Sequence, residues 1–450
     1  MYDEGKKSIL SSLLSGLLWI GGLLLLIFAV YKLGFAPIYN GEIGTEEEFQ
    51  QESEEKTVIL PEETSDSEEE TIALSETETE PAEAETTESE GTDEVPSDSS
   101  ESAAIYNYIN SMTLEQKVAQ LLFITPEELT GVDNATVWGD MSVSAYGEYP
   151  VGGLIYFSKN LVDPDQTKEM LQKADASSRE NTSLPLFIGI DEEGGRILRL
   201  AENKAFNLPK TPSMKELGEA GDSSAVFSAA DQIGQYLSEY GFNVDFAPVA
   251  DILTNPDNTV IGDRSFSSDP GLVASLTAEY AKGLHQHNIL SCYKHFPGHG
   301  GTTADSHDGS VTLERTLDEL RAEEFVPFSS GIAEGIDFIM TAHIKLPNIP
   351  EAEELPASLS PYMLTDILRH EMGYNGIIIS DALNMKAITD EFSDGDAAVK
   401  AFEAGCDMLL MPGDLKTSYD AVLEKIKSGE ITEDRLNESL YRIIRAKLTL

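Results

Sequence analysis

Charged and imidazole side chains follow directly after short apolar runs at several places in this chain. Asp381 closes one such run, Lys294 and His295 close another, and the segment after the second run contains Asp305 and His307. A carboxylate can act as a nucleophile, and an imidazole next to a second carboxylate can transfer a proton. These residue types and spacings therefore predict a site for nucleophilic and acid–base catalysis.

A second set of charged residues is suited to binding a polyhydroxylated ligand. Asp191 and Arg199 follow one apolar run, and Arg264 follows the next. Together with Lys294 and His295, they can make the charge-assisted and bidentate hydrogen bonds that fix the hydroxyl groups of such a ligand. Each residue alone has an ordinary structural explanation, such as a helix cap or an ion pair. Their recurrence at successive run ends favours one shared site.

Eight apolar runs alternate with amphipathic segments after residue 103. Runs that are apolar throughout, rather than alternating, are typical of strands buried on both faces of a parallel sheet. Eight βα units therefore predict an α/β fold of the (β/α)₈ barrel type, in which side chains at the carboxyl ends of the strands share one mouth. An open, doubly wound sheet is the alternative, but no Gly-x-Gly-x-x-Gly motif follows the first run. The expected strands lie at 120–125, 153–157, 186–191, 244–250, 290–295, 338–342, 376–381 and 408–411.

Capping residues predict where several helices between these strands begin and end. Ser360 followed by Pro361 is typical of the N-cap and first position of a helix, which Gly373 would close. Gly241 and Gly405 are expected to end two further helices, because glycine adopts the left-handed terminating conformation without strain.

The composition of the chain excludes some classes of protein. Its 450 residues include 80 acidic and 30 basic side chains, which give a formal net charge of −50. Such a charge would repel a phosphate backbone, so no nucleic-acid partner is expected. The two cysteines, Cys292 and Cys406, lie in apolar runs, which favours buried thiols over a disulfide framework.

The first part of the chain predicts a membrane anchor. Residues 9–30 are 22 residues without a charge, which as a helix would span roughly 33 Å and cross a hydrocarbon core. No small-x-small cleavage motif closes this run, so an uncleaved anchor is favoured over a signal peptide. Lys6 and Lys7 precede the run and only Lys32 follows it, which places residues 1–8 in the cytoplasm. We therefore expect a single-pass protein of the cell membrane whose catalytic part is extracytoplasmic.

Residues 31–102 predict a disordered acidic linker. Between positions 41 and 102 the chain has 24 aspartates and glutamates against one basic residue, Lys56. Such a segment cannot bury enough apolar surface to offset the loss of backbone entropy on folding. Its like charges would extend it into a spacer between the anchor and residues 103–450, which we expect to form the barrel.

Three motifs within residues 103–450 resemble those of the family 3 glycoside hydrolases, and more narrowly those of its single-domain β-N-acetylhexosaminidase branch. They are IDEEGGR at 190–196, KHFPGHG at 294–300 followed by DSH at 305–307, and SDALNM at 380–385. The resemblance implies a retaining exo-β-N-acetylhexosaminidase that acts on carbohydrates with terminal N-acetylglucosamine and needs no cofactor. Two positions depart from the usual pattern: Glu192, where Gln is frequent, and Gly301, where Asp or Asn is frequent.

The resemblance also implies a role for each candidate residue. Asp381 matches the catalytic nucleophile, His307 the acid/base, and Asp305 the carboxylate that orients His307. The positions that match sugar-binding residues are Asp191, Arg199, Arg264, Lys294 and His295. No metal ion is implied. Given the expected anchor and spacer, cell-wall fragments are the expected natural substrate, which would give the protein a part in peptidoglycan turnover.

Three other functions are compatible with the same residues. His295, His299, His307 and Asp305 could hold a metal ion, although the first expected strand lacks the His-x-His motif frequent in barrel metallohydrolases. Phosphate could replace water as the acceptor, so that a phosphorylase or another β-glycosidase is the second alternative. A membrane-tethered glycan-binding module without activity is the third, although binding alone would not require Asp381, Asp305 and His307 together.

Overall fold

The computed structural model describes residues 100–302 and 309–450. The predicted anchor at 9–30, most of the predicted linker at 31–102, and the candidate residues Asp305 and His307 lie outside the described residues. Within the described part of the chain, no helix combines the length and the apolarity that a membrane span requires. The first described helix begins at Ser100, close to the expected start of the barrel at residue 103.

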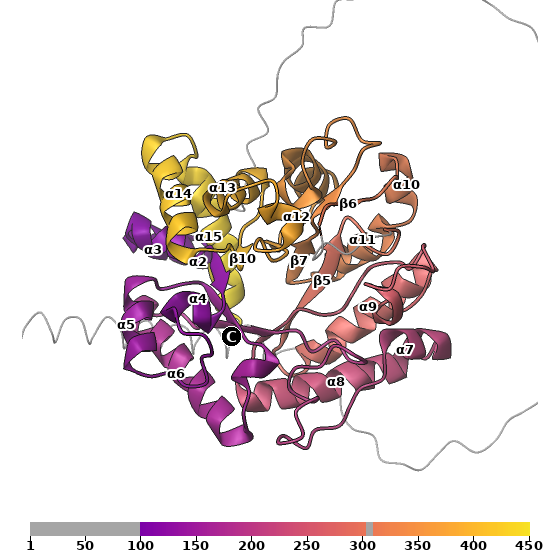
Figure 1. Ribbon diagram of the computed structural model, residues 1–450, viewed down its shortest axis with the longest axis horizontal. Coiled ribbons are helices and arrows are strands. Elements are labelled where there is room, and N and C mark those ends of the chain that lie inside the picture. The colour runs from indigo at the N-terminus through magenta and orange to yellow at the C-terminus, as the bar shows by residue number, and fades with distance from the viewer. Residues whose placement is uncertain (1–99, 303–308) are drawn as a thin grey trace, which may run out of the picture. The chain divides into compact units, whose positions relative to one another are not determined.

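Eight parallel strands form a barrel that helices surround (Figure 1). The hydrogen-bonded order is β10-β1-β2-β3-β4-β5-β7-β9, and a parallel bridge from Ile379 to Met408 joins β9 to the segment that enters β10. All eight expected strands are confirmed, in the expected parallel arrangement. The strands are Leu122–Ile124 (β1), Gly153–Ile155 (β2), Phe187–Ile190 (β3), Val244–Asp245 (β4), Leu290–Phe296 (β5), Phe338–Thr341 (β7), Ile377–Ser380 (β9) and Leu409–Leu410 (β10).

Aromatic rings fill the inside of this barrel. The Phe123 ring lies 5.2 Å from that of Phe246 and 6.4 Å from that of Phe187, and Phe187 lies 5.4 Å from Phe338, centroid to centroid. Gly189 faces two of these rings, because a Cβ there would lie 2.8 Å from atoms of both Phe123 and Phe246. Closely packed rings therefore fix the spacing of the strands that carry the site.

Helices connect successive strands and cover the outside of the barrel (Figure 1). Several of them begin at a Ser, Thr or Asp N-cap whose side chain accepts a hydrogen bond from the first turn, as at Asp222 and Asp269. The helices are Ser100–Ser111 (α2), Leu114–Ala119 (α3), Pro126–Thr130 (α4), Asp140–Glu148 (α5), Pro164–Thr182 (α6), Met214–Ala220 (α7), Ser223–Tyr240 (α8), Pro270–His285 (α9), Leu317–Ala322 (α10), Phe325–Glu334 (α11), Lys386–Thr389 (α12), Asp394–Ala404 (α13), Leu415–Ser428 (α14) and Glu433–Lys447 (α15). Three short 3₁₀ helices, Ser158–Asn160 (η1), Gly262–Arg264 (η2) and Ala357–Leu359 (η3), and the π-helix Tyr362–Glu371 (η4) complete the set.

The predicted helix ends are confirmed at three positions. Gly241 and Gly405 cap α8 and α13 with φ values of 98° and 127°. Gly373, with φ 72°, follows η4. That helix begins at Tyr362 with Pro361 as its N-cap, one residue later than the expected N-cap Ser360 and first position Pro361. It is a π-helix, whose turn is wider than that of an α-helix.

A separate two-stranded parallel sheet lies at the mouth of the barrel and was not expected from the sequence. Val311–Thr312 (β6) pairs with Ile344–Lys345 (β8), and β8 follows the carboxyl end of β7. Thr302, on the other side of 303–308, follows the carboxyl end of β5. Both flanks of 303–308 therefore lie at the carboxyl end of the barrel strands.

The opposite end of the barrel is closed by α15. Lys447 is fully buried there, donates to Gln120 Oε1 at 2.9 Å, and lies 5.1 Å from the centre of the Phe187 ring. Asp407, which precedes β10, is likewise fully buried and pairs with Arg369 at 2.8 Å and with Arg442 at 3.1 Å. Charged groups at this end are thus occupied in holding the closing helices.

Candidate active site

Four charged side chains form an ion-pair network at the carboxyl ends of β3 and β5. Lys294, on β5, donates to Asp191 Oδ1 at 2.8 Å and lies 2.7 Å from Glu193 Oε1. Arg264, the last residue of η2, binds the Glu193 carboxylate through Nε and Nη2, both at 2.8 Å. The network unites three residues predicted from the sequence, Asp191, Arg264 and Lys294, and adds Glu193.

The members of this network hold one another in the charged state. Burial alone would raise the pKa of Glu193 and lower the pKa of Lys294 and of Arg264. The opposite charges outweigh burial, so the pKa of Glu193 lies below its ordinary value and those of Lys294 and Arg264 lie above theirs. The Lys294 and Glu193 side chains are 3% and 2% exposed, whereas Asp191 is 18% exposed. Asp191 is therefore the member best placed to meet a ligand.

Arg199 extends the site toward β2. Its Nη2 lies 3.9 Å from Asp191 Oδ2, and its guanidinium carbon lies 5.9 Å from the centre of the Phe157 ring, just beyond β2. The Arg199 Nε is buried and makes no hydrogen bond to any residue that the structure describes. A buried donor without an acceptor is costly, so this nitrogen is suited to an oxygen of a bound ligand.

Asp251 fixes the segment that carries His295. Its Oδ2 lies 2.7 Å from His295 Nδ1, and its Oδ1 accepts hydrogen bonds from the backbone N–H groups of His295 and His299 at 3.1 and 2.6 Å. Burial would raise the pKa of Asp251, but the charge of His295 and the bonds to both histidines lower it. Because a carboxylate only accepts hydrogen bonds, the Nδ1 of His295 donates to Asp251, and Nε2 is the ring nitrogen that can face a ligand.

His299 lies next to His295 and was considered from the sequence only as a possible metal ligand. The two rings are 5.8 Å apart, and Thr302 Oγ1 lies 2.8 Å from His299 Nδ1. Burial and the neighbouring His295 lower the pKa of His299 below its ordinary value, which favours the neutral ring. Among the described residues, no group of three or more His, Cys, Asp or Glu side chains is placed to hold a metal ion.

Asp381 follows β9 directly, as expected, and is partly exposed. Its backbone N–H donates to Thr341 O at 2.9 Å, and its Oδ1 accepts from Ala382 N at 2.7 Å. His343 braces the next residue, with Nε2 3.0 Å from Ala382 O and Nδ1 2.7 Å from Ser358 Oγ. His343 thus holds the end of β9 in place, and Asp381 projects from a rigid strand end.

Two glycines let the KHFPGHG segment pack against the barrel. Gly298 has φ 130°, and a Cβ there would lie 2.6 Å from Glu324 Cγ. At Gly301, a Cβ would lie 2.9 Å from both Leu313 Cδ1 and Thr254 Oγ1. The close neighbours explain why this chain has no side chain at 301, one of the two departures from the family pattern.

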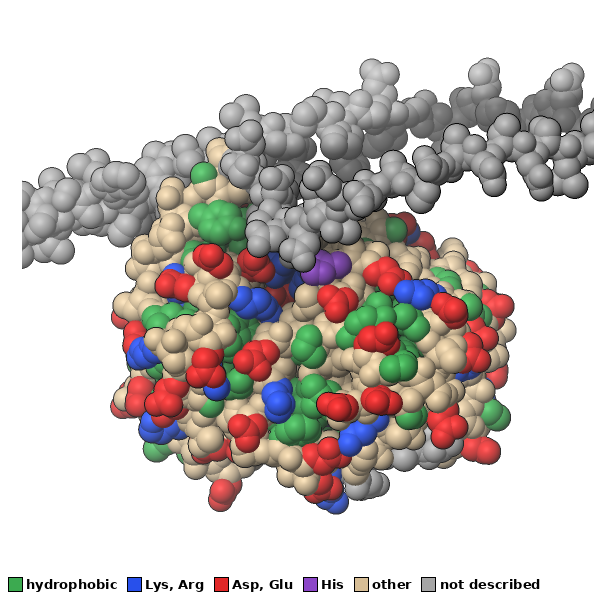
Figure 2. Space-filling view, turned by 90° about the horizontal axis from the view of Figure 1, so that it is seen from above, with side chains coloured by type: hydrophobic (Ala, Val, Ile, Leu, Met, Phe, Trp, Pro, Cys, Tyr) green, Lys and Arg blue, Asp and Glu red, His purple; other side chains and the backbone are tan. Residues whose placement is uncertain are grey.

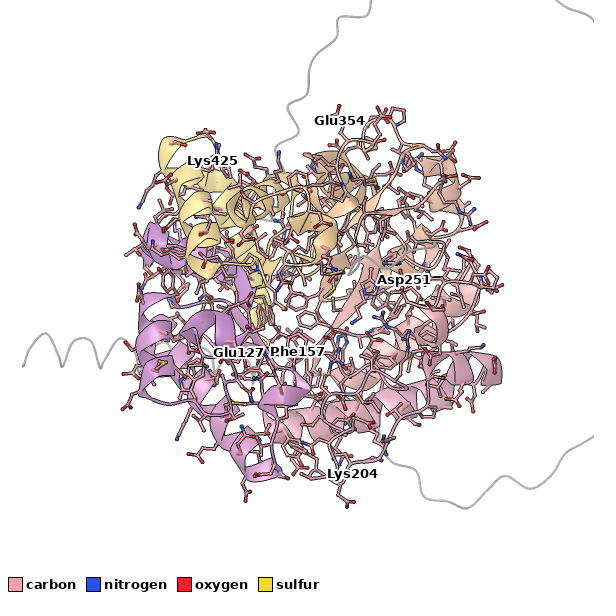
Figure 3. All side chains as sticks on the ribbon, viewed as in Figure 1. Glu127, Phe157, Lys204, Asp251, Glu354 and Lys425 are labelled. Atoms are coloured by element: carbon pink, nitrogen blue, oxygen red, sulfur yellow. The ribbon has the colours of Figure 1, made fainter. Side chains whose placement is uncertain are left out.

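The structure brings together most of the residues predicted from the sequence. Asp191, Arg199, Arg264, Lys294, His295 and Asp381 all lie at the carboxyl ends of the strands. Figure 3 shows Asp251 and Phe157 inside the ring of helices. Lys204, Glu354 and Lys425, by contrast, lie at the edge of that view. Sequence reasoning assigned no role to Glu193, which lies in the IDEEGGR motif, or to Asp251, which directly follows the expected strand at 244–250. Only the buried partners of these two carboxylates reveal their role.

Comparison with known proteins agrees with this geometry. The family model described as the glycosyl hydrolase family 3 N terminal domain matches residues 113–446. Beta-hexosaminidase A of Pseudoalteromonas piscicida is 35% identical over 323 residues, 67% of this chain and 54% of that protein. Beta-hexosaminidase LpqI of Mycobacterium tuberculosis is 35% identical over 272 residues, 59% of this chain and 68% of that protein. The chain thus spans about half the length of the first of these relatives.

A solved structure gives the same result for the fold. The glycoside hydrolase family 3 β-N-acetylglucosaminidase from a Paenibacillus species superposes with a TM-score of 0.70 at 37% sequence identity. The match covers 75% of this chain and 63% of the Paenibacillus chain. The barrel fold is therefore shared with a solved member of this family.

Proposed function

This chain belongs to glycosyl hydrolase family 3, and from that premise we propose that it is a retaining exo-β-N-acetylhexosaminidase that removes terminal N-acetylglucosamine. The observation that carries the proposal is the buried network of Asp191, Glu193, Arg264 and Lys294 at the same end of the barrel as Asp381. Such a network presents fixed charges to sugar hydroxyls. The names of the relatives, beta-hexosaminidase and β-N-acetylglucosaminidase, support the same substrate class.

We assign the nucleophile to Asp381. Its carboxylate attacks the anomeric carbon, the bond from that carbon to the glycosidic oxygen breaks, and the leaving oxygen takes a proton from His307. Water then attacks the glycosyl–Asp381 intermediate, gives a proton to His307, and releases the carboxylate with net retention of configuration. Asp305 is assigned to orient His307. The position of both flanks of 303–308 at the mouth supports these two assignments.

The remaining residues bind the sugar and hold it in the orientation that the reaction requires. Asp191 accepts hydrogen bonds from sugar hydroxyls. Arg199 offers its Nε, which has no hydrogen-bond partner among the described residues, and His295 offers the ring nitrogen that does not face Asp251. The Nε and Nη2 of Arg264 are both bound to Glu193, so Arg264 acts on the ligand mainly by holding Lys294 and Glu193 in place. Preorganised charges of this kind stabilise a transition state because they need no reorientation during the reaction.

Replacing the nucleophile tests the proposal. Asp381→Asn should lower kcat on p-nitrophenyl N-acetyl-β-glucosaminide by at least about 10³-fold, because the amide cannot form the covalent intermediate. Asp390→Asn, at an exposed position after α12, is the control and should keep the wild-type rate. A near-normal rate for the Asp381 variant would contradict the mechanism. Repeating the assay with inorganic phosphate and looking for sugar 1-phosphate separates a hydrolase from a phosphorylase.

We also propose that the enzyme is anchored in the cell membrane through residues 9–30, with its barrel on the extracytoplasmic side and cell-wall fragments as its substrate. The support is the uncharged run itself and the acidic segment that follows it. Protease added to intact cells should remove the activity from a membrane fraction. Activity that stays with the soluble cytoplasmic fraction would contradict this location.

A further inference from the structure

The carboxylate of Glu192 is fully buried and accepts four hydrogen bonds. Its Oε2 accepts from the backbone N–H groups of Arg199 at 2.6 Å and Leu200 at 2.9 Å. Its Oε1 accepts from Ala201 N and from the Tyr236 hydroxyl, both at 2.9 Å. Three successive backbone N–H groups thus donate to one side chain. These hydrogen bonds join the two ends of the segment 192–201.

The Glu192 backbone is itself held by the barrel. Its N–H donates to Asp245 Oδ1, on β4, at 2.9 Å, and Tyr280 Oη, from α9, lies 3.3 Å from its carbonyl oxygen. Gly194 and Ile197 form a small antiparallel bridge within the same segment. The backbone at Glu192 is therefore fixed relative to the barrel. Because the Glu192 carboxylate binds the backbone N–H groups of residues 199–201, it fixes their position as well.

The residue held in this way is a proposed sugar ligand. The Arg199 side chain lies between Asp191 and Phe157, and its buried Nε makes no hydrogen bond within the described residues. An Arg side chain can meet a ligand oxygen only if its backbone is held, because a shift of about 1 Å is enough to misplace a reacting or binding group. Among the described residues, Glu192 Oε2 is the only acceptor for the backbone N–H of Arg199.

We infer that Glu192 is a positioning residue for substrate binding, which acts on the sugar through the backbone of Arg199. The inference rests on the proposed function, since Arg199 is assigned to the sugar there. A carboxylate fits the arrangement because both of its oxygens accept, and all four donors point at them. A glutamine, frequent at this position in the family pattern, keeps one oxygen acceptor and replaces the other with a donor.

The test compares two substitutions at Glu192. Glu192→Ala leaves the three backbone N–H groups without an acceptor, so KM for p-nitrophenyl N-acetyl-β-glucosaminide should rise at least 10-fold, while kcat falls less. Glu192→Gln should recover most of the KM, because the amide oxygen can still accept from Arg199 and Leu200. Tyr236→Phe removes only the hydroxyl donor and should leave KM near the wild-type value.

Two further measurements separate positioning from general folding. In an Arg199→Ala background, Glu192→Ala should raise KM little further, because its effect passes through Arg199. Amide hydrogen exchange at residues 199–201 should accelerate in Glu192→Ala, and in Glu192→Gln it should accelerate at Ala201 alone. Unchanged exchange, or equal effects with and without Arg199, would overturn the inference. A wild-type enzyme that does not cleave this substrate would instead contradict the proposed function, and the exchange measurement still tests Glu192.

Discussion

At the scale of single residues, the buried carboxylates of this barrel differ in what satisfies them. Glu193 is neutralised by two cations, Lys294 and Arg264. Asp251 is satisfied by one imidazole and two backbone N–H groups. One carboxylate oxygen of Asp245 has no hydrogen-bond partner in the part of the chain that the structure describes, and burial raises the pKa of Asp245 well above its ordinary value. The partners of each carboxylate determine the direction in which its pKa shifts. Carboxyl groups that lie near one another in this barrel can therefore have different protonation states.

Asp251 offers a prediction at this scale. Asp251→Asn keeps the shape, but its amide –NH₂ would face the Nδ1–H of His295, so the imidazole must change its tautomer or rotate. We expect kcat/KM on p-nitrophenyl N-acetyl-β-glucosaminide to fall about 10- to 100-fold, because a displaced ligand-binding group costs about 1–3 kcal/mol. The ¹⁵N shifts of His295 should report the tautomer. Asp263→Asn, at an exposed pair with Arg196, is the matched control, and an equal loss in both variants would contradict the role of Asp251.

At the scale of elements, the site residues lie at the carboxyl ends of the strands, and side chains that pack inside the barrel position those strands. β5 pairs with β7 and β7 with β9, so Lys294, His295 and Asp381 leave the sheet at the same end. Aromatic rings from several strands pack inside the same barrel, and a Cβ at Gly189 would lie 2.8 Å from atoms of both the Phe123 ring and the Phe246 ring. Packing in the interior is therefore a condition for the geometry at the mouth.

Overpacking at Gly189 should show this dependence. In Gly189→Ala the added methyl would lie 2.8 Å from Phe123 and Phe246, which cannot retreat into a filled barrel. We expect the free energy of unfolding in urea to fall by about 1–3 kcal/mol, with reduced activity. Gly139→Ala, where no atom lies within 4 Å of the new Cβ, should change stability by less than about 1 kcal/mol. Equal stability of both variants would contradict the packing account.

At the scale of the whole molecule, negative charge dominates. The chain carries a net charge of −50, and acidic side chains spread between basic ones across the face in Figure 2. Against this background, Lys447 is a buried amine at the closed end of the barrel, held by one amide oxygen and one aromatic face. Burial lowers the pKa of Lys447 to about 7. The helix α15, which closes the barrel, therefore contains a buried amine that loses its proton near neutral pH.

This buried amine should make stability depend on pH. The pKa of Lys447 is about 7 in the folded state and about 10.4 in an unfolded chain. Between these values the unfolded state binds more protons, so the contribution of Lys447 to stability rises as the pH rises from 7 to 10. Lys447→Met removes this dependence and should raise the free energy of unfolding by about 2–4 kcal/mol at pH 7, and by less at pH 10.

Urea unfolding of both proteins at several pH values measures this difference. Lys416→Met, at a side chain that is 70% exposed, is the control and should give a curve parallel to wild type. A parallel curve for Lys447→Met as well would contradict the assignment.

The sequence by itself determined the number and order of the barrel strands and the end of the barrel to which the candidate site residues belong. Short runs that are apolar throughout are typical of strands buried on both faces, and the polar residue that ends such a run then lies at the carboxyl end of a parallel strand. Asp191, Lys294 and Asp381 follow from that reasoning alone. The helix ends at Gly241 and Gly405 follow as well, because the conformation that stops a helix is a local property of glycine.

Only the tertiary structure decided which neighbours satisfy those residues. The two cations on Glu193, the histidines on Asp251 and the backbone donors on Glu192 come from segments up to about a hundred positions away in the chain. The pairing of β6 with β8, which places the chain that follows 303–308 at the mouth, has no local signal either. The hydrogen-bond and ion-pair partners of a buried polar group depend on the distances and the desolvation in the folded barrel. The type of a residue and its position in the chain determine neither the distances nor the desolvation.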